Sequence, residues 1–354
     1  MTKGITVARM TIGIDLSDQE GTYVELDEHG DVAGEGKLKL TEHGVRRVMT
    51  TREPALVVIE VGPHSPWVSR LLGELGHEVI VANARQLRLI SHGVRKSDRL
   101  DAETLARLAR VDPALLKPLS HRGAQAQADL AAVRSRAALV AARTALINSA
   151  RGMAKAMGMR LPSCSAESFA TKVRQGMPAV LETALSPLLA SVAELTKQID
   201  ISGRHLEKLA QERYPEAAAL RQVKGVGPLV SLTYVLTLED KQRFRRSRDV
   251  GAYLGLTARQ RESGESKPQL HITKAGDRYL RSLLVQSAHH IMGRGPDTDL
   301  RRWGQRLAGN GNKTLKKRAI TAVARKLAVL LHRLWVTGEV YEPLRNSEKL
   351  EVAA

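Results

Sequence analysis

Four acidic residues stand in contexts where a carboxylate needs an explanation. Asp15 lies within the apolar run IGIDL, and Glu60 ends the apolar run LVVIE. A charge inside an apolar strand is costly unless another charge compensates it. Asp98 and Asp101 are spaced i, i+3 in KSDRLDAET, so they would point the same way from a helix. Together the four carboxylates are predicted to hold two Mg²⁺ ions, which in phosphoryl transfer hold an attacking and a leaving oxygen about 3.5–4 Å apart.

A structural interpretation competes with this metal site for two of the residues. Asp98 and Asp101 could cap a surface helix or form ion pairs with Lys96 and Arg99. For that pair taken alone, the structural interpretation is favoured. For all four acids, two on strands and two on a helix, the metal site is favoured.

The acids are positioned by a predicted α/β domain over residues 1–112. Three alternating, β-rich stretches come first: ITVARMTIGIDLS, GTYVELDEHG and DVAGEGKLKL. A helix over 42–51, the strand ALVVIEVG, a helix over 65–75, the strand HEVIVA and a helix over 97–110 follow. The last two strands are continuously apolar, which is typical of a sheet covered on both faces.

Residues 113–212 are predicted to form a long helical, coiled-coil region that acts as a spacer and in oligomerisation. Apolar residues recur at helical spacing over 130–147 and again over 188–209. Leu161-Pro162-Ser163 separates the two helices, and Ser186-Pro187 is predicted to begin the second one as N-cap and first helical residue. The two stripes could pack on each other within one chain or form a dimer seam, and the pattern favours neither.

The charge balance predicts a polyanionic partner. The 354 residues include 55 Lys and Arg against 37 Asp and Glu, a formal charge of +18. Residues 1–60 hold 7 basic and 11 acidic residues, whereas residues 294–333 hold 11 basic and 2 acidic ones. Aromatic residues make up only 3% of the chain, which favours contacts to phosphates over base stacking. The mainly helical region 213–345, followed by a tail over 346–354, is therefore predicted to contact a nucleic-acid backbone.

The predicted phosphate contacts are basic residues at turns and on helix faces of this region. The KGVG turn at 224–227 could present backbone N–H groups to a phosphate, or it could be a plain turn between helices. Lys274, Arg278 and Arg281 are expected to share one face of a helix, and another basic helix is expected over 313–335. The full set of candidate contacts is Lys224, Arg259, Arg261, Lys267, Lys274, Arg278, Arg281, Lys313, Lys316, Lys317 and Arg318.

Cysteine usage and hydropathy predict a cytoplasmic protein that does not span a membrane. The single cysteine, Cys164, excludes a disulfide framework and a Cys-rich zinc site. The start of the chain lacks the apolar core of a signal peptide, and no apolar run approaches the ~18 residues of a membrane helix.

The acidic segments resemble those of a known family. IGIDLS, VVIEVGPHS and KSDRLDA, in this order and spacing, are similar to the nuclease domain of the DEDD transposases of the IS110 insertion-sequence family, and within it to the IS1111 group. The resemblance covers nearly the whole chain. It implies an RNase H-like (RuvC-like) first domain in which Asp15, Glu60, Asp98 and Asp101 are the Mg²⁺ ligands.

A second set of segments is similar to the transposase domain of the same family. These segments are KGVG, AYLGLTA, RESGES and TKAGDRYLR, and Ala258 stands where a proline is common. The resemblance implies that Ser263 is a nucleophile. From the residues alone, Ser263 is a loop serine among basic residues that could hold a phosphate and stabilise developing negative charge.

The function implied by the resemblance is DNA strand cleavage and exchange by a homo-oligomer, a dimer or a tetramer, guided by a non-coding RNA from the element itself. The alternatives are a junction-resolving nuclease that uses the same acids with water as nucleophile, and a non-catalytic nucleic-acid-binding regulator. Thirty helical residues span about 45 Å, so the helices are expected to separate the acids from Ser263. A composite site is therefore predicted, in which the acids of one protomer meet Ser263 of another.

Overall fold

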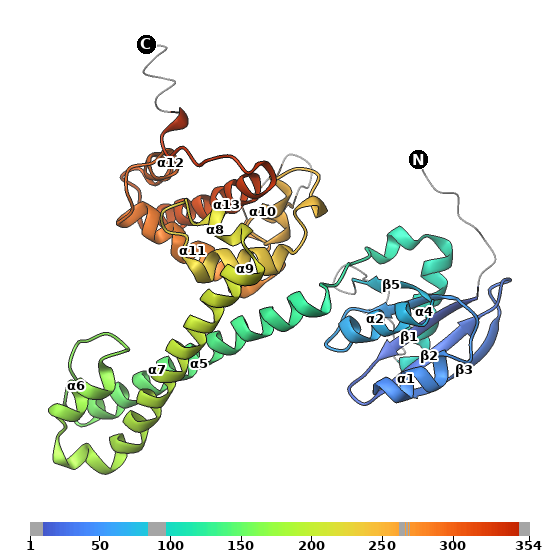
Figure 1. Cartoon of the computed structure of the whole chain (residues 1–354), viewed down its shortest axis with the longest axis horizontal. Coiled ribbons are helices and arrows are strands. Elements are labelled where there is room, and N and C mark those ends of the chain that lie inside the picture. Colours follow the sequence, from blue (N-terminus) through green and yellow to red (C-terminus); the bar gives the residue numbers. More distant parts are fainter. Residues whose placement is uncertain (1–9, 84–96, 262–265, 267, 269, 347–354) are drawn as a thin grey trace. The chain divides into compact units, whose positions relative to one another are not determined.

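The computed structural model describes residues 10–83, 97–261, 266, 268 and 270–346. The chain divides into two compact units, Met1–Ala124 and Gln125–Ala354. The first unit holds the sheet and the second is helical (Figure 1). A mixed α/β first part and a mostly helical remainder agree with the sequence prediction.

The sheet of the first unit has five strands in the order β3-β2-β1-β4-β5. The strands are β1 (Thr11–Leu16), β2 (Glu20–Leu26), β3 (Val32–Lys39), β4 (Leu56–Glu60) and β5 (Glu78–Ala82). Strands β1, β2 and β3 form an antiparallel meander, and β4 and β5 extend the sheet in parallel from β1. Their order along the chain confirms the strand and helix order expected from the sequence.

Helices cover both faces of this sheet. On one face, α1 (Glu42–Met49) and α2 (Ser65–Glu74) pack against alternate residues of β1 and β4, including Ile12, Ile14 and Ile59. On the other face, α4 (Asp98–Val111) and a 3₁₀ turn (Pro113–Leu116) cover Val58 and Ala82. Residues i and i+2 of a strand share a face, so one apolar run supplies both cores.

The contact between α4 and β1 is unusually close because β1 carries a glycine there. A Cβ atom on Gly13 would lie 1.9 Å from the carbonyl oxygen of Ala102. Ala102 and Ala106 present small side chains of α4 to Val24 and Leu26 of β2 in the same layer. Small residues on both sides let the helix backbone sit directly on the sheet.

The second unit begins with two long antiparallel helices. These are α5 (Ala124–Ala156) and α7 (Ala179–Arg213), joined through the short α6 (Phe169–Gln175) (Figure 1). Near the start of α5, Asp129 accepts a hydrogen bond from Arg213 at the end of α7, at 2.9 Å. Midway, Arg143 of α5 donates to Thr196 of α7 at 3.3 Å. The chain therefore runs out along α5 and back along α7.

This hairpin corrects two expectations. Ser186-Pro187 does not begin the second helix, because α7 starts at Ala179 and contains Pro187 at an exposed position. The helix length also no longer supports a separation of the acids from Ser263, because α7 returns to the start of α5, where Arg213 donates to Asp129. A composite site between protomers stays a prediction without that geometric reason.

The apolar stripes of α5 and α7 are buried within the single chain. Leu130 and Val133 of α5 share a core with Leu206 and Leu209 of α7 and with α9. Ile147 shares a second core with other residues of α7 and with Phe169 of α6. These residues therefore pack within one chain, while a dimer seam formed by half-exposed residues of the stripes, such as Val140 and Leu195, stays a prediction.

The remaining helices form one further core. They are α8 (Glu216–Leu220), α9 (Pro228–Leu238), a 3₁₀ turn (Lys241–Arg243), α10 (Asp249–Tyr253), α11 (Arg278–Gly293), α12 (Asp299–Ala308) and α13 (Lys313–Thr337). Tyr234 of α9 is fully buried and donates a hydrogen bond to the carbonyl of Ala328 in α13 at 2.6 Å. Of the described helices, α7 alone is long and apolar enough to cross a membrane by length and composition, a test that core helices also pass.

Candidate active site and nucleic-acid interface

Asp15 and Glu60 lie at matching positions of two adjacent strands. The parallel pairing of β1 and β4 ends with Ile14 opposite Ile59, so the next residues along the two strands are Asp15 and Glu60. Their side chains point away from the face of Ile14 and Ile59, toward the face that α4 covers. Both acids are half-buried. Neighbouring strands are about 4.8 Å apart, so two carboxylates project from adjacent backbones at the carboxyl ends of β1 and β4.

The first turn of α4 lies at the same end of the sheet. Ala106 packs near Leu26, which pairs with the first residue of β1, and Ala102 packs on Gly13, two residues further along that strand. The strand therefore approaches the start of α4 as it runs toward Asp15. From Gly13 to Asp15 the strand advances about 6.7 Å, and from Ala102 back to Asp98 the helix recedes about 6 Å. Asp98 therefore lies at about the height of Asp15 along the sheet, and Asp101, in the same first turn, lies only about 1.5 Å along the helix axis from Ala102.

The described side chains do not complete a metal site. Within 10–83 and 97–346, apart from the undescribed loop positions, no group of three or more His, Cys, Asp or Glu side chains is close enough to hold an ion. Asp98 is exposed and Asp101 is half-buried. Carboxylates are the ligands that Mg²⁺ prefers, so the donor set fits this ion, while the convergence of all four acids stays a prediction.

The structural interpretation of Asp98 and Asp101 receives little support. Ser97, and not an aspartate, caps α4 by accepting from the N–H of Leu100 at 3.3 Å. Arg99 donates instead to Glu35 at 2.6 Å and to Glu103 at 3.0 Å. Lys96 lies outside the described residues.

The segment after Glu60 is anchored by residues that the sequence analysis missed. Ser65 is fully buried, and its hydroxyl donates to the carbonyl of Gly62 and accepts from the Gly62 N–H. The same hydroxyl is 2.9 Å from Nε2 of His121. These contacts close the VGPHS turn beside the end of β4, so they fix the backbone just beyond Glu60.

The Ser263 loop is closed at its base, while its tip lies outside the described residues. Ala258 pairs with Ile272, and the Arg259 N–H donates to the carbonyl of His271 at 2.9 Å. Arg259 and Arg261 are exposed on one side of this stem. Ser263 and Lys267 fall outside the described residues, so their placement stays a prediction.

The expected basic helix face at Lys274, Arg278 and Arg281 is wrong for two of its members. α11 begins at Arg278 after the N-cap Asp277, and Lys274 precedes it with a φ of 57°. Arg281 is on the helix, but its Nη1 donates to the carbonyls of Leu254 and Ala275 at 3.0 and 2.7 Å. Arg281 therefore ties the preceding turn to α11, and Arg278 is the exposed cation of the three that lies on the helix.

The turn at Lys224 is shaped by packing. Gly225 has a φ of 99°, and a Cβ there would lie 3.0 Å from the Ile291 side chain of α11. Glycine is thus required at position 225 by the positive φ and by the close approach of α11. Lys224 is exposed beside it.

The basic start of α13 has the character of a binding surface. Lys313, Lys316, Lys317 and Arg318 are exposed in its first two turns, and the first turn has no acidic residue. Positive charges near a helix N-terminus oppose the helix dipole, at a cost of about 0.3–1 kcal/mol each. Helix stability therefore does not explain this cluster, and its contact with a nucleic acid stays a prediction.

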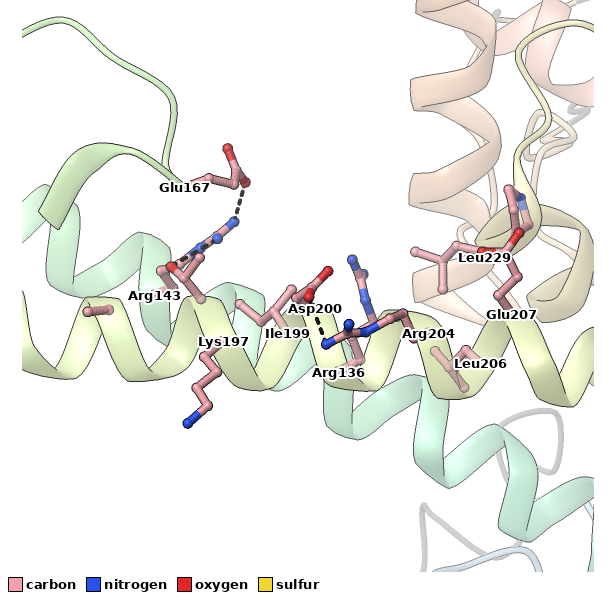
Figure 2. A pocket seen from close by; sticks show the side chains of 14 residues that line it. Arg136, Arg143, Glu167, Lys197, Ile199, Asp200, Arg204, Leu206, Glu207 and Leu229 are labelled. Atoms are coloured by element: carbon pink, nitrogen blue, oxygen red, sulfur yellow. Dashed lines mark hydrogen bonds and ion pairs between the residues drawn. The ribbon is translucent and has the colours of Figure 1, made fainter. Parts of the chain in front are cut away.

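A pocket on the hairpin has balanced charge. It lies between α5, α7 and the start of α9, and Arg143 and Glu167 meet at one end of it (Figure 2). Arg143 is only 7% exposed and donates to Glu167 at 2.9 Å. Arg204 forms an ion pair with Asp200 at 3.0 Å. Because charges of both signs pair in this pocket, it connects the helices of the hairpin and is not a favourable site for a polyanion.

Comparison with known proteins defines the class. Residues 12–158, which contain all four acids, match the DEDD family of IS110 elements described as "Transposase". Residues 217–303, which contain Ser263, match the family described as "Transposase IS116/IS110/IS902 family". The chain is thus a transposase, an enzyme of DNA recombination that binds DNA.

Curated relatives extend the likeness over most of the chain. A "Probable family 20 transposase" of Pseudomonas aeruginosa is 30% identical over 287 residues, covering 79% of this chain and 83% of the relative. The "Transposase for insertion sequence element IS1111A" of Coxiella burnetii is 25% identical over 93% of this chain and 90% of its own length. That for IS1328 of Yersinia enterocolitica is 28% identical over 92% and 95%. The chain belongs to the IS116/IS110/IS902 family of transposases.

Proposed function

We propose that this transposase cuts and exchanges DNA strands with a serine nucleophile and divalent ions, guided by an RNA encoded by its own element. The observation that carries the proposal is the backbone arrangement of the first unit. Asp15 and Glu60 leave adjacent parallel strands on one face, and the first turn of α4 lies at the same end of that face.

Four carboxylates would hold the ions. Asp15 and Glu60 would supply oxygen ligands from the rigid sheet, and Asp98 and Asp101 would supply them from α4. Bound Mg²⁺ would stabilise negative charge on the phosphate oxygens during the reaction. The acids would position the reacting phosphate through the ions they hold, because two of them are fixed by the strands and two by a helix that packs closely on the same sheet at Gly13.

Ser263 would perform the exchange. Its hydroxyl oxygen attacks phosphorus, and the new O–P bond forms as the bond from phosphorus to the 3′ oxygen breaks. The serine gives up its proton, and the leaving 3′ oxygen takes one up. The products are a phosphoserine joined to the 5′ end and a free 3′-hydroxyl, so the reverse reaction with another 3′-hydroxyl joins new strands. Arg259 and Arg261 would hold the phosphate at the stem of this loop.

The test of the metal site compares two aspartates of one neighbourhood. Asp15→Asn should abolish Mg²⁺-dependent cleavage of a DNA duplex carrying the element's end, because it removes a ligand charge without changing shape. Asp18→Asn is the matched control, since Asp18 lies just after β1 and its side chain is 98% exposed. Cleavage by Asp15→Asn at the wild-type rate, or cleavage in EDTA, would refute the proposed site.

The nucleophile separates this proposal from a junction-resolving nuclease. A serine nucleophile predicts a protein–DNA adduct that survives denaturing electrophoresis, is absent in Ser263→Ala and is retained in Ser266→Ala. A nuclease that uses water needs Asp15 but forms no adduct.

The guide is tested by sequencing RNA that co-purifies with the full-length protein expressed beside its element's flanks. One enriched element-encoded RNA is expected. The absence of such an RNA from a cleavage-active preparation would exclude RNA guidance.

A further inference from the structure

A concave surface on the C-terminal helices gathers cations outside the predicted contact set. It lies between α12, α13, the segment after α13 and residues on either side of α10, and it encloses about 870 Å³. Arg248 precedes α10, Arg306 lies on α12, and Arg325 and Lys326 lie on α13. We call these four residues the α12–α13 cation cluster. None of them is among the individual contact residues predicted from the sequence.

Close helix packing brings the cluster together. A Cβ on Gly304 of α12 would lie 2.5 Å from the Val323 side chain of α13, so glycine allows the two helices to approach closely there. Lys326 follows Val323 by one helical turn, and Arg306 follows Gly304 by two residues. A Cβ on Gly251 of α10 would lie 3.0 Å from Cγ of Arg325, so the stem of this arginine rests against α10.

Carboxylates on the same surface are already engaged. Glu339 accepts from Arg333 at 2.8 Å and lies 3.4 Å from Nη1 of Arg345. Asp299 accepts from the backbone N–H of Asn346 at 2.7 Å. Over the described part of the chain, no carboxylate lies within ion-pair distance of the four cluster residues. Glu339 and Glu342 are therefore neutralised near the C-terminal segment, where Arg345 pairs with both, whereas Asp299 keeps its charge on the side of the surface that holds the four cations.

The cations of the cluster repel one another. Lys326 Nζ lies 4.0 Å from the centre of the Trp303 ring, a cation–π contact that fixes the ammonium group. Burial, followed by the charges of Arg325 and Arg306, lowers the pKa of Lys326, while Asp299 has a smaller opposite effect. Asp299 offsets only part of this repulsion, and like charges held beside each other lower stability, a cost that an anionic ligand would remove.

We propose that the α12–α13 cation cluster is a binding site for the sugar–phosphate backbone of a nucleic acid. Two cations on α13, one on α12 and one just before α10 exceed what one phosphate can engage, and they suit successive phosphates of a strand. Trp303 positions Lys326 and is not assigned a stacked base. The inference does not depend on the proposed serine chemistry, because binding is measured without cleavage.

The first experiment measures the salt dependence of binding by the full-length protein. The probes are a 30-base-pair DNA duplex of arbitrary sequence and a 30-nucleotide single-stranded RNA. Each phosphate contact contributes about −0.9 to the log–log slope for duplex DNA and about −0.7 for a single strand. Arg325→Gln with Lys326→Gln should therefore flatten the duplex slope by up to about 1.8. If wild type and variant bind the duplex equally at 1 M salt, this change in slope makes the variant bind about 30-fold more weakly at 0.15 M salt.

A charge-matched control uses exposed lysines elsewhere in the second unit. Lys155→Gln with Lys172→Gln removes the same charge from α5 and α6 and should leave the slope unchanged. The probe whose slope falls identifies the bound nucleic acid. An unchanged slope for both probes in the cluster variant, or equal losses in the two variants, overturns the proposal, since the effect would be absent or would follow net charge alone.

The second experiment locates the contact without a substitution. Lysine acetylation followed by mass spectrometry should show Lys326 protected at least several-fold by a saturating probe, with Lys155 modified equally with and without it. Equal modification of Lys326 with and without both probes contradicts the site. Full protection by inorganic pyrophosphate at the same phosphate concentration contradicts a backbone site in favour of a small-anion site. Loss of cleavage with intact protection of Lys326 would contradict the proposed chemistry and would leave the binding site supported.

Discussion

Because α4 packs closely on β1 at Gly13, Gly13→Ala is the most informative substitution in the first unit. The new Cβ would start 1.9 Å from the carbonyl oxygen of Ala102 and 3.0 Å from the N atom of Ala106. Contacts of a Cβ below 3.0 Å are essentially never found, so α4 must move away from the sheet by about 1.1 Å. The obstacle is helix backbone, which cannot turn aside as a side chain can.

Two effects of different size follow from that displacement. Overpacking of this kind costs about 1–3 kcal/mol of stability, offset by about 0.4–1 kcal/mol because alanine reduces the freedom of the unfolded chain. The chain should therefore still fold. A shift of about 1 Å in groups that must act together costs about 100-fold in rate. Since α4 carries Asp98 and Asp101, cleavage should fall about 100-fold in a protein that remains folded.

Hydrogen exchange and Mg²⁺-dependent cleavage, both on the full-length protein, measure the two effects. Gly13→Ala should lose protection over 98–111, and cleavage should fall. Gly73→Ala is the control, because a Cβ there meets no heavy atom within 4 Å, and its helical position should make it neutral or slightly stabilising. Wild-type cleavage by Gly13→Ala with reduced protection of α4 would show that the acids of α4 do not take part.

Three further results are expected. Asp129→Asn should lower the free energy of unfolding by about 2–3 kcal/mol, because hydrogen bonds to a buried charge are lost. Burial raises the pKa of Asp129, but the hydrogen bonds from Tyr214 and Arg213 outweigh burial and lower that pKa. The difference in stability between variant and wild type, measured by denaturation, should therefore shrink as the pH falls below the ordinary aspartate pKa of about 3.9. His332 is 1% exposed and burial lowers its pKa, so thermal stability should decline as the pH falls below about 6.5, and His332→Gln should reduce that decline if the fold is retained. Mixed dimers of Asp15→Asn and Ser263→Ala should recover partial cleavage if protomers share a site, whereas no recovery with mixed dimers present would mean that each chain forms its own.

The sheet and its helices were predictable because their patterns are local. Apolar runs of strand length, turn residues and helical spacing each act over a few residues, so the order of strands and helices along the chain and the position of α4 followed from the sequence. The close approach at Gly13 was not predictable, because it depends on a contact between β1 and Ala102, which are far apart along the chain.

Errors arose where a local pattern had two physical readings. A Ser-Pro pair is typical of a helix start, yet Pro187 is accommodated on the exposed side of α7 because the buried stripe on the other side continues through it. Lys274 fitted a helical spacing with Arg278, but the N-cap Asp277 stops the helix short of it. The α12–α13 cation cluster has no sequence signal of its own, since its members come from α12, α13 and the residue before α10.

The antiparallel pairing of α5 with α7 has a consequence for how the length of this hairpin can change. Adding one residue to α5 alone would turn everything beyond it by about 100° and shift it by about 1.5 Å, so Arg143 would lose Thr196 and the shared core would lose register. Matched insertions of about two turns in both helices would restore the register and leave the Asp129 joint and the Phe169 core intact. Tolerated length changes should therefore occur as equal insertions or deletions in both helices. The length of the hairpin can then change by whole helical turns while the packing at its two ends stays the same.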